Sequence, residues 1–176
     1  MTGTDVRVEV TDSCLISRHY INRYNVEEEW EHYLQDYREY LKTVCSLEEL
    51  SQILPEIESI EYKKQILCLQ NRKQNPFVIC KIMKQKIQIG FCDYICYADE
   101  DGKCLIGNFF VYAEHRNKGY GSAAYEQIER ELKQQNGKYI DITPAKDAIL
   151  FYLRKGFQKT TQKSLENGEI VYRKQI

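Results

Sequence analysis

In the stretch Arg116-Asn117-Lys118-Gly119-Tyr120-Gly121, a basic loop with two glycines joins an apolar run to a helix-like segment. The apolar run is Phe109 to Tyr112, and the helix-like segment is Ser122 to Gln135. Backbone N–H groups converge at the start of such a helix, and the helix dipole adds partial positive charge there. Glycines let the backbone approach a ligand closely because they have no Cβ atom. The stretch therefore predicts a site that binds a phosphate.

The loop differs from the commonest phosphate-binding motifs. It lacks the Gly-Lys-Ser/Thr ending of P-loop NTPases. It also lacks the third glycine and the acidic residue on a following strand that a dinucleotide-binding fold requires. The simplest alternative is a basic turn that only caps a helix, so the surrounding sequence has to distinguish the two interpretations.

A second informative segment follows the helix. Residues 139–143 alternate apolar and polar side chains and end at Pro144, which predicts a strand. Residues 147–157 then predict a short helix that Gly156 terminates. One face of that helix carries Ala148, Phe151, Tyr152 and Lys155.

Together the two segments resemble the signature blocks of the GCN5-related N-acetyltransferase (GNAT) superfamily. Arg-x-x-Gly-x-Gly after an apolar strand resembles the family's acetyl-coenzyme A pyrophosphate loop, and Ala-Ile-x-Phe-Tyr-x-x-x-Gly-Phe resembles its second block. The blocks occur in the family's order and cover about residues 104 to 157. One position departs from the pattern: Ala145 stands where many members carry an Asn that contacts the cofactor.

The resemblance implies transfer of an acetyl group from acetyl-coenzyme A to a primary amine, by direct attack within a ternary complex. The amine would belong to a small molecule or to a protein. In the family, the strand before the loop holds the pantetheine arm through its backbone, and the loop holds the pyrophosphate. The residues expected to bind the cofactor are therefore Phe110, Val111, Tyr112, Arg116, Asn117, Lys118, Gly119, Tyr120, Gly121 and Ser122.

The resemblance also implies a catalytic role for Tyr152, which stands where the family places its general-acid tyrosine. The alternative is a tyrosine that only packs on the apolar face of its helix. No motif marks the base that would take a proton from the substrate ammonium. Glu114, between the strand and the loop, is our candidate, and its alternative is a solvent-facing residue paired with His115 or Arg116. Further candidates are Asp93, Tyr94 and Asp141.

Net charge and composition restrict the classes of partner that we expect for this protein. The net charge of −1 gives no overall electrostatic attraction to nucleic acid or to anionic membranes. No apolar run reaches the ~18 residues of a membrane span, and residues 1–5 lack the start of a secretory signal. The 7 cysteines include no Cys-x-x-Cys pair. We therefore expect a cytoplasmic protein with reduced thiols, no metal site, no nucleic-acid partner and no membrane partner.

The resemblance predicts an α/β fold with a mixed, mostly antiparallel sheet of six to seven strands and helices on both faces. We expect a single domain over residues 1–176, with an extended helical segment at about 26–74 near the substrate side. The pattern predicts strands at 6–10, 77–83, 87–97 with a bulge at Gly90, and from the turn at 99–102 through Tyr112. It predicts helices at 26–45, from a capping box at Ser46 to a break at Pro55, and at 57–70. Asn167-Gly168 predicts a final hairpin.

Two other functions fit the same sequence. A regulatory module of this fold would bind acyl-coenzyme A without turning it over, and the Ala145 departure leaves room for it. A third alternative is a phosphate-binding fold for another nucleotide. The tyrosine-rich segment 30–40 fits either a core or a homodimer interface. The sequence marks neither the acceptor amine nor the length of the acyl group.

Overall fold

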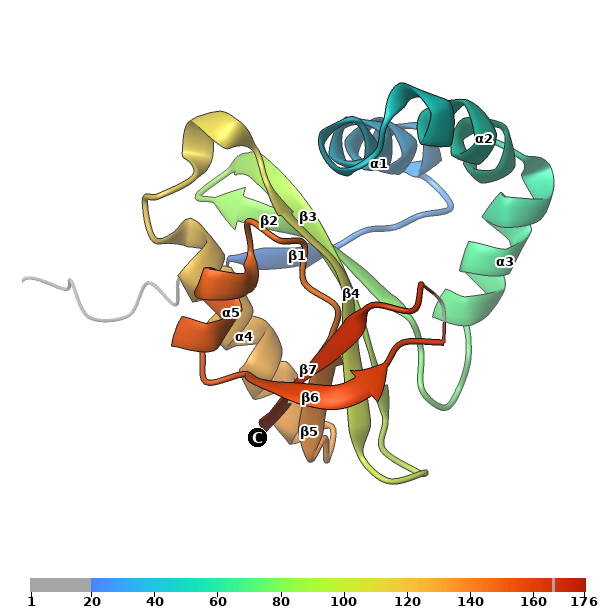
Figure 1. Cartoon of the computed structure of the whole chain (residues 1–176). Coiled ribbons are helices and arrows are strands. Elements are labelled where there is room, and N and C mark those ends of the chain that lie inside the picture. The colour runs from blue at the N-terminus through green and yellow to red at the C-terminus, as the bar shows by residue number, and fades with distance from the viewer. Residues whose placement is uncertain (1–19, 166) are drawn as a thin grey trace, which may run out of the picture.

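The computed structural model describes residues 20–165 and 167–176, so the strand expected at 6–10 lies outside the described residues. Its elements, coloured along the chain in Figure 1, are β1 (Ile21–Arg23), α1 (Trp30–Val44), α2 (Leu47–Ile57), α3 (Ile60–Gln70), β2 (Val78–Lys84), β3 (Ile87–Tyr97), β4 (Lys103–Val111), a 3-10 turn (Ala113–His115), α4 (Tyr120–Gln134), β5 (Tyr139–Ile142), α5 (Ile149–Arg154), β6 (Gln158–Lys163) and β7 (Ile170–Gln175).

The described strands form one seven-stranded sheet in the order β1-β2-β3-β4-β5-β7-β6. Its neighbouring strands pair antiparallel except β4 and β5, which pair parallel. Figure 1 shows α4 and α5 on one side of the sheet and α1 to α3 on the other. This confirms the predicted mixed, mostly antiparallel sheet with helices on both faces. Among the described residues, no helix is long and apolar enough to cross a membrane.

Each face of the sheet has its own core. On the α4 side, Tyr125, Ile128 and Leu132 of α4 are fully buried against the sheet. On the α1 side, an aromatic stripe at helical spacing packs onto β3 and β4. The stripe consists of Tyr33, Tyr37 and Tyr40, whose rings follow one another at 5.9 and 6.1 Å between centroids.

Two local expectations are confirmed and one is wrong. Ser46 forms the predicted capping box with Glu49, and the ladder between β2 and β3 has its irregularity beside Gly90, where a Cβ would lie 2.0 Å from the carbonyl oxygen of Phe110. The break at Pro55 does not occur, because α2 continues to Ile57. Pro55 stands in the last turn, where the missing N–H removes only one hydrogen bond.

The buried thiols occur in two directly opposed pairs on the sheet. Cys80 faces Cys92 between β2 and β3, and Cys96 faces Cys104 between β3 and β4. All four belong to the core under α4, and burial raises the pKa of Cys92 and Cys104. Thiols in such surroundings act as small apolar side chains.

Helix α4 is joined to β7 by a partly buried ion pair between Glu129 and Lys174. Glu129 accepts hydrogen bonds from Lys174 and, at 3.0 Å, from Lys133. Burial opposes the ionisation of Glu129, but the two ammonium groups outweigh it and lower its pKa to about 2. A carboxylate whose pKa falls on folding stabilises the fold above its unfolded pKa of about 4.3 and loses that effect as the pH falls.

We therefore expect Glu129→Gln to lower the free energy of unfolding by about 1–3 kcal/mol at pH 7. The difference from the wild type should shrink between about pH 5 and pH 2, where the native carboxylate is protonated. Urea denaturation at a series of pH values measures this. Glu126→Gln is the control: Glu126 pairs with Lys155 with its side chain 57% exposed, so the loss should stay below about 1 kcal/mol. Equal losses in the two variants would contradict the assignment.

Candidate functional site

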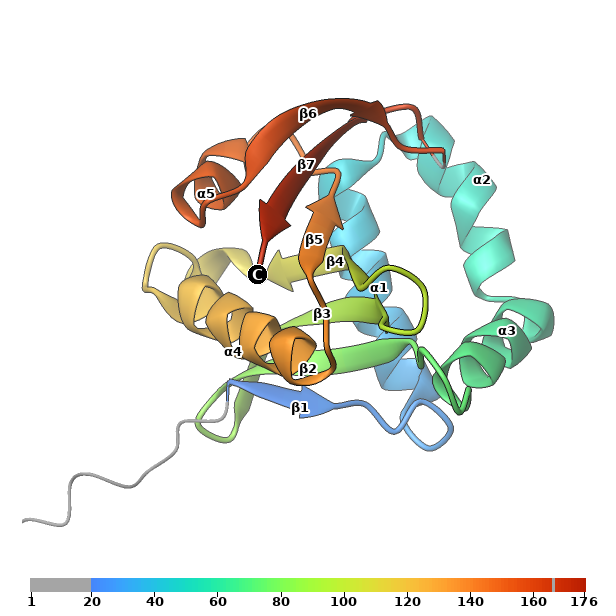
Figure 2. The same cartoon turned by 90° about the horizontal axis from the view of Figure 1, so that it is seen from below.

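The sheet opens between its two parallel strands. β4 and β5 pair only from Lys103–Tyr139 to Leu105–Asp141. β5 also pairs with β7 along its whole length and ends at Ile142, and Figure 2 shows β4 and β5 running in different directions. The edge of β4 from Ile106 to Val111 is therefore left without a strand partner on the β5 side.

A bulge fixes β4 where it leaves β5. Between the pairs Tyr94–Ile106 and Cys92–Phe109, two residues of β4 lie opposite one residue of β3. The single residue is Asp93, which is 1% exposed and accepts hydrogen bonds from the Asn108 backbone N–H at 2.9 Å and side-chain Nδ2 at 2.6 Å. A Cβ at Gly107 would lie 2.4 Å from Asp93 Oδ1, so any other residue there would displace this carboxylate.

The hydrogen-bond pattern shows which backbone groups face the opening. Across the Gly90–Val111 pair, the Tyr112 N–H donates to the Ile89 carbonyl oxygen at 2.9 Å. Groups alternate along an antiparallel ladder, so the N–H and C=O of Val111 point to the opposite, unpaired edge. In agreement, Arg116 Nε donates to the Val111 carbonyl oxygen at 2.8 Å from that side.

The loop after β4 presents unpaired donors. Asn117 and Gly119 both adopt positive φ, at 57° and 82°, and Gly119 is the N-cap of α4. No backbone N–H from Asn117 to Ser122 has an acceptor among the described residues. The first turn of α4 carries no acidic side chain. Free N–H groups at the start of a helix and the helix dipole are features that favour the binding of an anion.

The two glycines of the loop face different surroundings. A Cβ on Gly119 would meet no atom within 4 Å, so its outer side is open to a ligand. A Cβ on Gly121 would lie in ordinary contact, 3.7 Å, with the side chains of Phe109 and Val111. The positive φ of Gly119 disfavours other residues, whereas Gly121 occupies helical backbone that accepts alanine.

These surroundings predict opposite stability changes. Gly121→Ala should raise the free energy of unfolding by about 0.4–1 kcal/mol, because alanine loses less chain entropy on folding. Gly119→Ala should lower it by about 1 kcal/mol, because of the left-handed backbone. Thermal and urea denaturation of the two variants measure both changes. A destabilised Gly121→Ala protein would mean that the space beside Phe109 is not available.

The cations of the loop lie along its backbone. Lys118 Nζ donates to the Glu114 carbonyl oxygen at 2.7 Å. The Arg116 guanidinium lies 5.3 Å from the centre of the Phe110 ring. The side chains of both predicted cationic residues thus donate to backbone carbonyl oxygens that precede the loop, those of Glu114 and Val111.

Tyr152 approaches the opening from the α5 side. It is 6% exposed, and its ring packs on Phe151 and Phe157 at 5.0 and 5.4 Å between centroids. Its hydroxyl has no hydrogen-bond partner in the described part of the chain and is not enclosed. Burial, followed by the proximity of Tyr40 and Cys92, raises the pKa of Tyr152. The hydroxyl therefore stays protonated at neutral pH and is free to donate.

The candidate bases differ in their surroundings. Glu114 lies on the 3-10 turn with its side chain 69% exposed, 3.8 Å from His115 Nε2. Asp141 forms an ion pair with Arg173 at 2.6 Å, and the Tyr94 hydroxyl donates to Glu131 at 2.5 Å. Asp93 lies in the bulge. Asp141 and the Tyr94 hydroxyl are therefore already paired, and the Asp93 carboxylate is directed at Asn108 of β4.

The sequence did not indicate that Asp36 connects α1 to the end of β4. Asp36 of α1 is 3% exposed and accepts hydrogen bonds from Tyr24, Gln88 and Tyr112. Tyr112 is the last residue before the loop, so Asp36 ties α1 to the end of β4. One sequence feature could have indicated this role: Asp36 stands next to Tyr37, on the tyrosine-rich side of the helix. A carboxylate buried there needs several hydrogen-bond donors.

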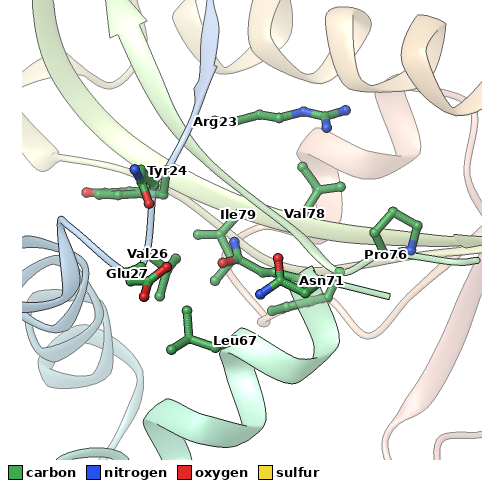
Figure 3. A pocket seen from close by; sticks show the side chains of 12 residues that line it. Arg23, Tyr24, Val26, Glu27, Leu67, Asn71, Pro76, Val78 and Ile79 are labelled. Atoms are coloured by element: carbon green, nitrogen blue, oxygen red, sulfur yellow. The ribbon is translucent and has the colours of Figure 1, made fainter. Parts of the chain in front are cut away.

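A separate hollow lies at the β1 edge of the sheet, between the end of β1, the start of β2 and the end of α3 (Figure 3). Its volume is about 310 Å³, and Leu67, Val78 and Ile79 form part of its lining. Two strands, β2 and β3, separate β1 from β4. The hollow is therefore not part of the opening beside β4.

A mixed sheet that opens between its parallel strands, beside an anion-binding helix start, defines a protein of the GNAT fold. Residues 73–159 match the sequence profile of the family described as "Acetyltransferase (GNAT) domain". The chain belongs to the GNAT superfamily.

Solved structures agree in fold. The PaiA N-acetyltransferase of Thermoplasma acidophilum, determined with coenzyme A, has a TM-score of 0.68 at 14% identity, over 89% of this chain and 98% of that one. An acetyltransferase of Streptococcus agalactiae gives 0.65 at 15% identity, over 89% and 97%. Tetrahymena GCN5 gives 0.58 at 19% identity, over 89% and 94%. A search of curated protein sequences finds no significant match.

Proposed function

We propose that this protein is an acetyl-coenzyme A-dependent N-acetyltransferase that acts on a primary amine of a small molecule or a protein. One observation carries the proposal: the free N–H groups from Asn117 to Ser122 lie beside the unpaired edge of β4. A pyrophosphate matches the first feature, and an extended arm with amide groups matches the second. Coenzyme A contains both.

The unpaired edge of β4 would supply the backbone groups that hold the acyl end of acetyl-coenzyme A. The Val111 N–H would donate to the thioester carbonyl oxygen and stabilise the negative charge that develops there. The Val111 carbonyl, now bonded to Arg116, would accept from an amide of the pantetheine arm once the guanidinium moves to the phosphates. Arg116 and Lys118 would add positive charge beside the pyrophosphate.

The reaction balances without a covalent enzyme intermediate. An ammonium acceptor first loses one proton to water or to a nearby carboxylate. The amine nitrogen then bonds to the thioester carbonyl carbon, the C–S bond breaks, and the nitrogen loses its second proton to solvent. The Tyr152 hydroxyl gives its proton to the departing thiolate and is later reprotonated from solvent. The products are the amide, the coenzyme A thiol and one proton. Glu114 and Asp93 are the candidates for the carboxylate.

Removal of the Tyr152 hydroxyl tests its role. Tyr152→Phe keeps the ring, so we expect a loss in kcat of about tenfold or more and an acetyl-coenzyme A Kd within about threefold of wild type. Because its raised pKa keeps Tyr152 protonated, wild-type kcat/KM should not fall with rising pH below about pH 10.

Tyr125→Phe is the matched control, since Tyr125 belongs to the same ring cluster but its hydroxyl is enclosed. Stopped assays of thiol release, with calorimetry for cofactor binding, measure both variants. Unchanged turnover in Tyr152→Phe would remove this residue from the mechanism.

Titration with acetyl-coenzyme A tests the proposal itself. We expect wild-type protein to bind and Gly119→Glu to bind at least about tenfold more weakly, because the new carboxylate enters the open space over the free N–H groups. Gly168→Glu places the same carboxylate at another open glycine of positive φ, in the turn between β6 and β7, and should bind like wild type. Circular dichroism checks the folding of each variant. If the wild-type protein does not bind acetyl-coenzyme A, the loop only begins helix α4 and the proposal is wrong.

A non-catalytic acyl-coenzyme A module is the second candidate. It is favoured by Ala145, which is exposed and offers no polar side chain where many relatives contact the cofactor. Acetyl-coenzyme A binding without thiol release over a panel of amines would support this candidate against the enzyme.

A further inference from the structure

The last part of β4 has a strand partner on one side only, so its free edge needs another support to keep a fixed orientation. At one end of this part, Asp93 holds the bulge at Asn108. At the other end, the Tyr112 N–H donates to the Ile89 carbonyl oxygen at 2.9 Å. Val111 lies between these two fixed points, with its N–H facing the unpaired edge.

Tyr112 is held a second time, through its side chain. Its hydroxyl donates to Oδ1 of Asp36, a residue that is 3% exposed. Asp36 belongs to α1, which crosses behind β3 and β4 in Figure 2. The other two donors to Asp36, Tyr24 and Gln88, both bond to Oδ2. A shift of Tyr112 would therefore take from a buried carboxylate oxygen the donor that faces it, at a high cost in free energy.

Asp36 also reaches the strand opposite Val111. The amide nitrogen of Gln88, which donates to Asp36, also donates to the Gly90 carbonyl oxygen at 3.3 Å. Gly90 is the residue of β3 that pairs with Val111. One buried carboxylate thus contacts the residue that follows Val111 and, through one side chain, the residue that faces it.

The hydroxyl donors of this network keep their protons. Burial, and after it the hydrogen bond to Asp36, raises the pKa of Tyr24 and of Tyr112. Both hydroxyls therefore remain donors at neutral pH. A hydrogen bond to a charged group away from water is stronger and more directional than one on the surface.

We propose that Asp36 is a positioning residue for the reaction, and that it acts through Tyr112 to fix the direction of the Val111 N–H. The inference rests on the proposed acetyltransferase function, in which this N–H donates to the thioester carbonyl oxygen. Such a donor stabilises the developing negative charge only when it is aimed at the oxygen before the reaction begins. Asp36 lies on α1, outside both signature blocks, and acts on the backbone of β4.

Tyr112→Phe and Tyr24→Phe form a matched pair of variants. Each removes one hydroxyl donor from Asp36 and leaves two others, so we expect similar shifts of the urea midpoint. Only Tyr112 adjoins Val111. In the thiol-release assay, kcat should therefore fall about tenfold in Tyr112→Phe and stay within about twofold of wild type in Tyr24→Phe. The Kd of acetyl-coenzyme A should stay within about threefold in both, because the loop is unchanged.

Infrared spectroscopy of bound acetyl-coenzyme A tests the same point without an acceptor amine. A heavy carbon isotope at the thioester carbonyl separates its stretching band from those of the protein. A well-directed hydrogen bond lowers and narrows this band, so Tyr112→Phe should move it to higher frequency and broaden it. Tyr24→Phe should give the wild-type band. A wild-type band in Tyr112→Phe, or equal changes in the two variants, would overturn the proposal.

A further variant shows whether the Tyr112 hydroxyl acts through Asp36. Asp36→Asn replaces one acceptor oxygen by an NH₂ donor. Two donors share Oδ2, so the new nitrogen should take the Oδ1 position, facing Tyr112. Asp36→Asn should then reproduce the band of Tyr112→Phe, and the double variant should change it no further. Additive changes would mean that Tyr112 acts on the acyl group directly, and would refute the role of Asp36.

The cofactor titration separates this inference from the proposed function. If wild-type protein does not bind acetyl-coenzyme A, the proposed function fails and this inference fails with it. If wild-type protein binds the cofactor but the two tyrosine variants behave alike, only the role of Asp36 is refuted.

Discussion

The separation of β4 from β5 is the constraint on which the site depends. Parallel strands normally continue to pair, but here the ladder ends at Leu105 and Asp141. The Asp93 carboxylate then holds a bulge at Gly107 and Asn108, which turns the following stretch of β4. The result is an edge whose N–H and C=O groups are satisfied on the β3 side only. In most sheets such an edge is a liability, and here it is enclosed by helices on both faces.

The opening brings together groups from two cores that the sheet would otherwise keep apart. The α4 core supplies Tyr152 and the start of α4, and the α1 core supplies Phe110 and Tyr112 at the end of β4. Asp36 connects them further, because it binds Tyr112 at the point where β4 becomes the loop. Burial of a carboxylate costs little free energy when several donors bond to it. Removal of one of those donors destabilises the fold strongly. Helix α1 and the loop therefore hold each other in position.

The positive charge at the site is concentrated in the loop after β4. The chain as a whole is nearly neutral, at −1, yet the loop presents free N–H groups together with Arg116 and Lys118.

The anion-binding loop, the helix of Tyr152 and the final hairpin could be predicted from sequence because each depends on neighbours within a few residues: glycines, a helix start, an apolar face or a turn. The roles of Asp93 and Asp36 could not, since their hydrogen-bond partners are 12 to 76 residues away in the chain. Pro55 shows the same limit, because only the packed helix α2 decides whether one missing N–H breaks it. The loop expected to bind phosphates could be identified from local backbone chemistry. Only long-range packing determines where the sheet opens and which side chains meet there.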